Sequence, residues 1–206
     1  MNIDFEGIES KVKSAANNNP EWESIVHSVS LASEIFLLGN GGLHYVASHL
    51  ATDMTRLIEG KTFYSFDSVG FITSNANDHG FNNVFVKWLE VVSSHKEPSS
   101  IAVLGMSCSG ASTNVINALD WASSRGSATH LISGVRPYSG FSHKSLVLGC
   151  EFFHTVEVSC LMLLYELIYR CGSTCPSIQE EISRCAHSNR RVLSPKPKEK
   201  NDNSSD

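Results

Sequence analysis

The stretch Ile101-Ala-Val-Leu-Gly-Met-Ser-Cys-Ser-Gly-Ala-Ser-Thr-Asn-Val115 decides the fold. Its first four residues are apolar and have the length and composition of a buried strand. A loop of glycines and hydroxyl residues follows, and apolar residues then recur at helical spacing, at Val115, Ala118, Leu119 and Ala122. A strand, a Gly/Ser loop and a helix N-terminus can bind an anion, because free N–H groups and the positive end of the helix dipole face outward there. Plain turns with a helix N-cap have the same composition, so both interpretations stay open.

The overall composition is that of an ordinary globular protein. The chain has 206 residues, of which 41% are hydrophobic and 18% charged, and this length allows one domain with a sizeable core. The formal charge of −5 gives no reason to expect nucleic-acid binding. No apolar segment approaches the ~20 residues that span a bilayer, and the acidic N-terminus is unlike a signal peptide. We therefore expect a cytoplasmic protein, with one domain over residues 1–190 and a disordered polar tail over residues 191–206.

The six cysteines are expected to be free thiols. Three lie in or beside apolar runs, and the three near the C-terminus lack the tight paired spacing of structural zinc motifs, so a zinc site there is weakly supported. The two groups are Cys108, Cys150 and Cys160, and Cys171, Cys175 and Cys185.

Two helices are predicted before the first strand. Residues 4–17 place apolar side chains on one face, which is typical of an amphipathic helix. Asn19 as N-cap and Pro20 as first helical residue then begin a second helix. We expect the apolar faces of this pair to pack on the sheet or on another subunit.

The first predicted strand leads into a second glycine-rich loop. Residues 35–38 are a buried strand, and residues 39–42, Gly-Asn-Gly-Gly, precede a helix over residues 43–55. The glycines permit positive φ and close approach of the backbone to a ligand. In the helix, His49 and Asp53 share a face. A surface salt link is one interpretation of that pair, and a catalytic or metal pair is the other.

The rest of the chain alternates between strands and helices. The predicted segments are strands or loops over residues 63–66 and 70–73, a turn-rich connection over 74–80, helices over 81–92, 151–170 and 176–186, and strands over 128–133 and 146–148. This alternation favours a mostly parallel sheet covered by helices on both faces. Ligands in such sheets lie at the carboxyl ends of the strands, where both Gly/Ser loops are expected. Two loops at one edge favour the ligand interpretation over that of plain turns.

Four motifs in order resemble the SIS (sugar isomerase) domain family, in its phosphoheptose isomerase branch: Gly39-Asn-Gly-Gly42, His49, Asn77-Asp78-x-Gly80-Phe81 and Ser107-x-Ser109-Gly-x-Ser112-x-Asn114. The resemblance covers about residues 1–170. It implies an α/β fold, a three-layer αβα sandwich with a five-stranded parallel sheet. It also implies a homotetramer with active sites at subunit interfaces, in which the N-terminal helices over residues 1–33 take part in packing.

The resemblance further implies a sugar phosphate as partner and an aldose–ketose isomerisation. The family interconverts sedoheptulose 7-phosphate and D-glycero-D-manno-heptose 7-phosphate, in carbohydrate metabolism and lipopolysaccharide biosynthesis. Proton transfer through an enediol needs a base and an acid of tuned pKa. The implied catalytic residues are Asp53 and His49. The implied substrate-binding residues are Asn40, Gly41, Gly42, Asn77, Asp78, Ser107, Ser109 and Ser112.

Several positions depart from the family pattern. Asp53 stands where the family has a Glu, and Leu43 replaces a phosphate-binding Ser. Alignment of the last long helix places Glu151 at a family Gln and Ser159 at the catalytic His. A serine cannot shuttle protons near neutral pH as an imidazole can. Whether isomerase activity survives is therefore open, and Asn77 and Asp78 also have a plain interpretation as caps of the helix that follows them.

The same alignment implies a candidate zinc site. The ligands would be His49, Asp53 and Glu151, with water as the fourth. A cleft lined by these polar side chains without a metal is an equal alternative.

Two other function classes compete with an isomerase. A non-catalytic SIS module would bind a phosphosugar, or a protein partner as the replication-initiator-associating relatives do, and act as a sensor or assembly factor. A nucleotide-binding domain fits the strand–helix alternation, but the chain has no Gly-x-Gly-x-x-Gly and no Gly-Lys-Ser/Thr after its loops.

Overall fold

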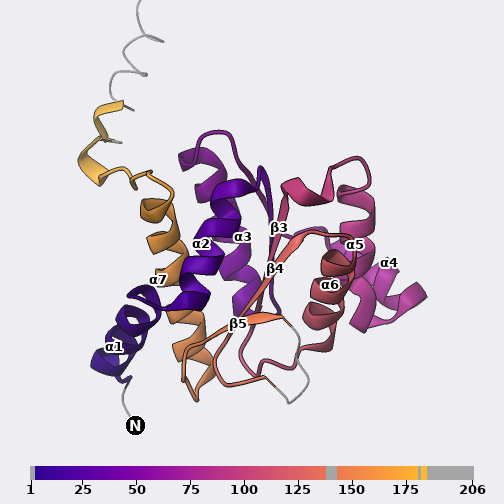
Figure 1. Cartoon of the computed structure of the whole chain (residues 1–206), viewed down its shortest axis with the longest axis horizontal. Coiled ribbons are helices and arrows are strands. Elements are labelled where there is room, and N and C mark those ends of the chain that lie inside the picture. The colour runs from indigo at the N-terminus through magenta and orange to yellow at the C-terminus, as the bar shows by residue number, and fades with distance from the viewer. Residues whose placement is uncertain (1–2, 138–142, 181, 185–206) are drawn as a thin grey trace, which may run out of the picture. The chain divides into compact units, whose positions relative to one another are not determined.

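The computed structural model describes residues 3–137, 143–180 and 182–184. The chain divides into two units, Met1–Ser173 and Thr174–Asp206. The first unit is a five-stranded parallel sheet between two layers of helices (Figure 1), which confirms the predicted αβα sandwich. In spatial order the strands are β2 (Thr62–Tyr64), β1 (Glu34–Leu38), β3 (Ile101–Ser107), β4 (Ala128–Ser133) and β5 (Lys144–Val147).

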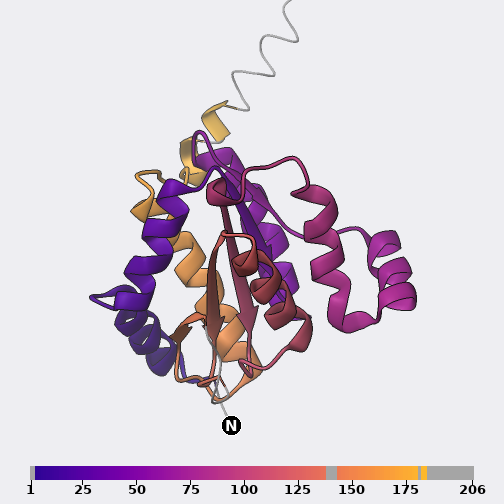
Figure 2. The same ribbon diagram turned by 45° about the vertical axis from the view of Figure 1, so that its right-hand side comes forward.

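The helices divide between the two faces of the sheet, as Figures 1 and 2 show. One face carries α1 (Phe5–Ala16), α2 (Pro20–Leu31), α3 (Gly42–Leu57) and α7 (Phe153–Arg170). The other carries α4 (Val69–His79), α5 (Val84–Val92) and α6 (Thr113–Ser124), with the short 3-10 turns η1 (Phe81–Asn83) and η2 (Pro98–Ser100). No helix among the described residues is long and apolar enough to cross a membrane.

The N-terminal helices begin as their sequences predict. Asp4 accepts a hydrogen bond from the N–H of Gly7 at the start of α1. The Asn19 side chain accepts from the N–H groups of Glu21 and Trp22 at the start of α2, where Pro20 is the first helical residue.

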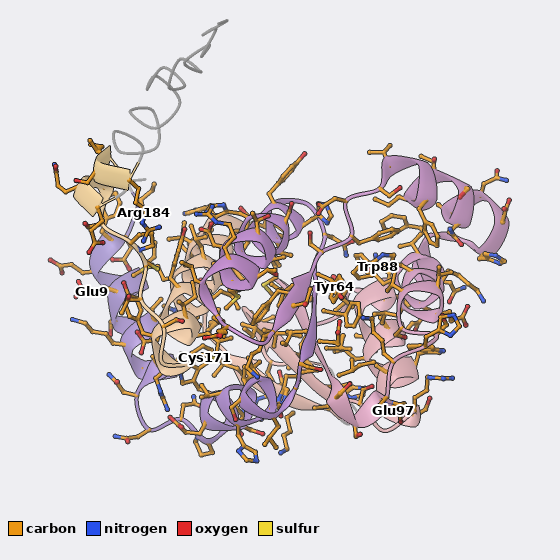
Figure 3. All side chains as sticks on the ribbon, turned by 90° about the horizontal axis from the view of Figure 1, so that it is seen from above. Glu9, Tyr64, Trp88, Glu97, Cys171 and Arg184 are labelled. Atoms are coloured by element: carbon orange, nitrogen blue, oxygen red, sulfur yellow. The ribbon has the colours of Figure 1, made fainter. Side chains whose placement is uncertain are left out.

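The central strand β3 and its aromatic neighbours form the core. All seven residues of β3 are buried, as its apolar run predicts. Phe36 on β1 stacks on Tyr64 with a centroid distance of 4.8 Å and meets Trp88 of α5 edge-on at 5.4 Å. Tyr64 and Trp88 are labelled in Figure 3. These contacts fix α5 and β2 against the strand that leads into the site.

The strand order reverses between β1 and β3. From β1 the chain runs through α3 to β2 on one side, whereas β3 lies on the other side of β1, with Leu38 in register with Gly105. Ligands of open parallel sheets lie at such a switch point, outside the carboxyl ends of the strands. The two glycine-rich loops follow these two strands and therefore lie side by side.

One predicted region differs in the structure. Residues 70–79 belong to helix α4, although residues 70–73 were predicted as a strand or loop and residues 74–80 as a turn-rich connection; Gly80 is the C-cap of the helix. The Ser68 hydroxyl caps this helix by accepting from the N–H of Phe71. Asn77 and Asp78 lie in its last turns and do not cap the helix that follows.

The second unit is described only in part. Residues 178–180 and 182–184 are helical, within the helix predicted over residues 176–186. The predicted disordered tail over residues 191–206 and the thiol of Cys185 lie outside the described residues.

Candidate functional site

A pocket of about 270 Å³ lies at the carboxyl ends of β1 and β3. Six of the eight predicted substrate-binding residues line it: Asn40, Gly41, Gly42, Ser107, Ser109 and Ser112. The structure therefore brings together two loops that are more than 60 residues apart in the sequence. The pocket has room for an anion and part of a sugar.

The serine loop holds its hydroxyls together at the start of α6. The Ser107 and Ser112 hydroxyl oxygens are 2.9 Å apart, and the N–H of Ser112 donates to the Ser107 oxygen at 3.3 Å. Ser112 is the N-cap residue of α6, but its side chain does not cap the helix. Because that hydroxyl is directed to Ser107 instead, the partial positive charge of the α6 N-terminus remains available to an anion in the pocket.

The glycine loop is shaped by two positions. Gly41 is the N-cap of α3 and has φ of 57°, a conformation that favours glycine. At Gly42, an added Cβ would lie 2.3 Å from the carboxylate of Glu157. Gly42 is therefore needed because the Glu157 side chain lies directly against the backbone.

Asn40 joins the two loops to each other. Its side-chain amide donates to the Asn114 oxygen at 2.9 Å and accepts from the Asn114 amide at 2.8 Å. Asn114 is in the first turn of α6 and is almost fully buried. Asn40 thus holds the α3 and α6 N-termini in register at the pocket.

Two residues of α7 that the sequence analysis missed also line the pocket, Phe153 and Glu157. They are four residues apart and share one helix face. Burial, followed by the nearby Glu157 carboxylate, raises the pKa of the Cys108 thiol in the pocket wall. The Cys108 thiol is therefore neutral near pH 7. The one sequence feature that could have indicated Glu157 as a site residue is its carboxylate beside the apolar stripe of α7.

A cluster of titratable side chains lies further along α3. His49 Nε2 is 2.9 Å from the Tyr165 hydroxyl and 3.7 Å from Asp53 Oδ2. The Tyr165 hydroxyl donates to Asp53 Oδ2 at 3.2 Å. We call these three residues the α3–α7 cluster. It does not line the pocket, and His49 is seven residues, or about 10 Å, along α3 from Gly42.

Comparison with known proteins agrees with this architecture. No family model matches the chain. Phosphoheptose isomerases of Escherichia coli and Shigella boydii are 32% identical to it over 114 residues, which are 53% of this chain and 57% of each relative. The matched region thus spans little more than half the length of those relatives.

Solved structures give the same fold over more of the chain. The phosphoheptose isomerase of Francisella tularensis superposes with a TM-score of 0.67 at 17% identity, covering 81% of this chain and 93% of that one. The phosphoheptose isomerase of Neisseria gonorrhoeae gives 0.67 at 20% identity, covering 80% and 92%. The chain therefore has the fold of these phosphoheptose isomerases.

The residue of α7 that contacts His49 and Asp53 in the structure differs from the one that the alignment selects. Tyr165, and not Ser159, meets His49 and Asp53. Ser159 is fully buried, with its oxygen 3.9 Å from the Cys150 sulfur. Glu157 and Tyr165 are eight residues apart, as are Glu151 and Ser159, so the residues that face α3 lie six positions later than the alignment places them.

The predicted zinc ligands do not come together within one chain. Among the described residues there is no group of three or more His, Cys, Asp or Glu side chains that could hold a metal ion. Glu151 is exposed and precedes α7, while His49 and Asp53 lie on α3.

The last two predicted substrate-binding residues lie away from the pocket. Asn77 and Asp78 are exposed on α4, and the Asn77 amide donates to the Asp78 carboxylate at 2.8 Å. They are absent from the pocket lining within the part of the chain that the structure describes.

Proposed function

We propose that this chain is an SIS-domain protein that binds a sugar phosphate in the pocket between β1 and β3 and isomerises it between aldose and ketose. The observation that carries the proposal is the serine loop at the uncapped N-terminus of α6, opposite the glycine loop in one pocket. Three hydroxyls and the helix N-terminus suit a phosphate dianion. The likeness to phosphoheptose isomerases supports sedoheptulose 7-phosphate as the substrate.

The proton transfers are assigned to the α3–α7 cluster. The Asp53 carboxylate would take the proton from the carbon beside the carbonyl, while a protonated His49 or the Tyr165 hydroxyl donates a hydrogen bond to the carbonyl oxygen. Transfer of a proton from that donor to the carbonyl oxygen gives the enediol. Asp53 then returns its proton to the former carbonyl carbon, while the donor recovers a proton from the neighbouring hydroxyl, which becomes the new carbonyl. A hydrogen-bonded carboxylate, imidazole and phenol are suitable acid–base groups.

Because the cluster lies outside the pocket, we propose that a second copy of the chain completes the site, as part of a homotetramer. A groove of about 650 Å³ between α1 and α7 supports such packing. Its lining is largely apolar and includes the exposed side chains of Ile3, Phe5, Val158 and Met162. Exposed apolar surface of this kind marks interaction sites.

The test is an assay of sedoheptulose 7-phosphate turnover by the purified chain, with and without added zinc, combined with its molar mass in solution. We expect aldoheptose phosphate to form and the mass to be that of four chains. Absence of turnover with this and other sugar phosphates would reject the isomerase.

A second candidate function is favoured by the same separation of pocket and cluster. A non-catalytic module would hold the sugar phosphate unchanged and act as a sensor or bind a protein partner. Recovery of bound sugar phosphate with unaltered carbonyl position, at saturating protein, would select this function over the isomerase.

A further inference from the structure

We propose that Glu157 determines the specificity of the pocket. It admits polyhydroxylated monophosphates and rejects ligands that carry a second anionic group near the bound sugar chain. This inference rests on the proposed function, since it takes the serine loop to hold the phosphate. It concerns a residue of α7 that none of the sequence motifs contains.

Glu157 is one of the α7 residues that line the pocket. Its carboxylate packs against Gly42, so it lies at the glycine-loop side of the pocket, whereas Ser107, Ser109 and Ser112 lie on the serine-loop side. A ligand phosphate on the hydroxyls would leave the rest of the molecule facing this carboxylate.

The Glu157 carboxylate is unpaired among the described residues. Among the described residues, no donor is hydrogen-bonded to the Glu157 carboxylate and no cation forms an ion pair with it. A carboxylate in a pocket accepts hydrogen bonds from ligand hydroxyl groups strongly, because one partner is charged. The vacant acceptor positions of Glu157 therefore fit a polyol chain.

Glu157 gives the pocket lining a negative charge. The described residues that line the pocket include no Lys, Arg or His, so Glu157 is the charged side chain among them. The α6 N-terminus offsets the phosphate, and nothing in this lining would offset a second anion beside Glu157. Two negative charges held close together in a pocket repel each other, so a ligand with a second anionic group is rejected.

The experiment compares two six-carbon ligands that differ at one carbon. Glucitol 6-phosphate has a CH₂OH group at C1, and 6-phosphogluconate has a carboxylate there. Calorimetry would measure both with the wild-type chain, with the isosteric variant Glu157→Gln, and with Glu97→Gln. Glu97 is exposed before the amino end of β3, is labelled in Figure 3, and carries the same change of charge away from the pocket.

We expect the wild type and Glu97→Gln to bind glucitol 6-phosphate at least ~10-fold more tightly than 6-phosphogluconate. In Glu157→Gln the ratio should fall below about 3-fold, with an unchanged melting temperature. Equal affinities in the wild type, or an unchanged ratio in Glu157→Gln, would overturn the inference and leave the proposed function standing. Failure of the wild type to bind either ligand or sedoheptulose 7-phosphate would instead reject the proposed function.

Discussion

The pocket and the α3–α7 cluster differ in what holds them. The pocket is built from backbone and short hydroxyl side chains at the ends of two buried strands, and Ser107, Ser112 and Asn40 are fixed by hydrogen bonds within it. The cluster is built from long ionisable side chains on two packed helices, His49 and Asp53 from α3 and Tyr165 from α7. Anion binding and proton transfer are thus assigned to separate elements, and each can be removed while the other remains.

The largest effect is expected at Asp53. Replacement by Asn keeps the size and one acceptor but removes the basic carboxylate, so kcat for sedoheptulose 7-phosphate should fall by roughly 10²–10⁴-fold. KM should change less than about 3-fold, because Asp53 does not line the pocket. Steady-state kinetics would measure both constants. Glu59→Gln, an exposed carboxylate just beyond α3, is the control. A rise in KM with kcat unchanged would place Asp53 in binding.

A substitution at Ser109 is expected to weaken ligand binding, whereas the substitution at Asp53 lowers kcat. Its side chain is exposed at the pocket, so Ser109→Trp should fill the anion site and weaken sugar-phosphate binding by at least ~100-fold without disturbing the core. Calorimetry would measure the binding, and circular dichroism the fold. Ser123→Trp, an exposed serine near the other end of α6, is the matched control. Binding retained by Ser109→Trp would show that the serine loop is a plain turn.

The sequence could predict the pocket but not the contribution of α7 to the site. The pocket follows from contiguous segments, because a strand, a glycine or serine loop and a helix start are each written within about ten residues, and parallel strands bring their carboxyl ends to one edge. The α7 side of the site depends on helix rotation against α3. Glu151 and Ser159 repeat at the same spacing as Glu157 and Tyr165, so spacing could not choose between the pairs. Only the packing of α7 against α3 and α1 does so.

The α4 region shows a different limit. No residue of α4 is fully buried, so the apolar periodicity that marks a helix is weak there. Its Ser, Thr and Asn residues favour turns by bonding to nearby backbone. In the structure those side chains instead bond back to helix carbonyls: Thr73 to Val69, and Asn75 to Phe71. The local signal therefore predicted a turn where a helix forms.

A substitution at His130 can distinguish a loss of activity at low pH from unfolding of the chain at low pH. It is buried on β4 with Nε2 2.8 Å from the Ser28 hydroxyl, and burial, then Lys144, lower its pKa to about 4. Between pH 6.5 and 4 the unfolded chain binds the proton more readily than the folded chain. Stability is therefore complete above pH 6.5 and declines as the pH falls through this window, by about 2 kcal/mol from pH 7 to pH 5.

The variant His130→Gln should remove that decline. Urea unfolding at pH 7 and pH 5 would measure the free energy of unfolding in both proteins. An activity loss at pH 5 that persists in His130→Gln, with the fold intact, would then not come from unfolding. An equal decline of stability in the wild type and the variant would show that other groups cause the acid sensitivity.

The smallest effect tests which residue of α7 belongs to the reaction. Tyr165→Phe removes the hydroxyl that joins His49 to Asp53, and a lost hydrogen bond in the transition state should lower kcat by about 10-fold. Ser159→Ala should leave kcat unchanged and alter only the free energy of unfolding, by about 1 kcal/mol, because its hydroxyl is enclosed beside Cys150. If Ser159→Ala lowered kcat while Tyr165→Phe did not, the alignment based on sequence would be right and α7 would have to turn in the assembled enzyme. Each variant removes one hydroxyl group from α7, at Tyr165 or at Ser159. Comparison of their kcat values therefore tests which face of α7 takes part in the reaction, which the sequence leaves undetermined.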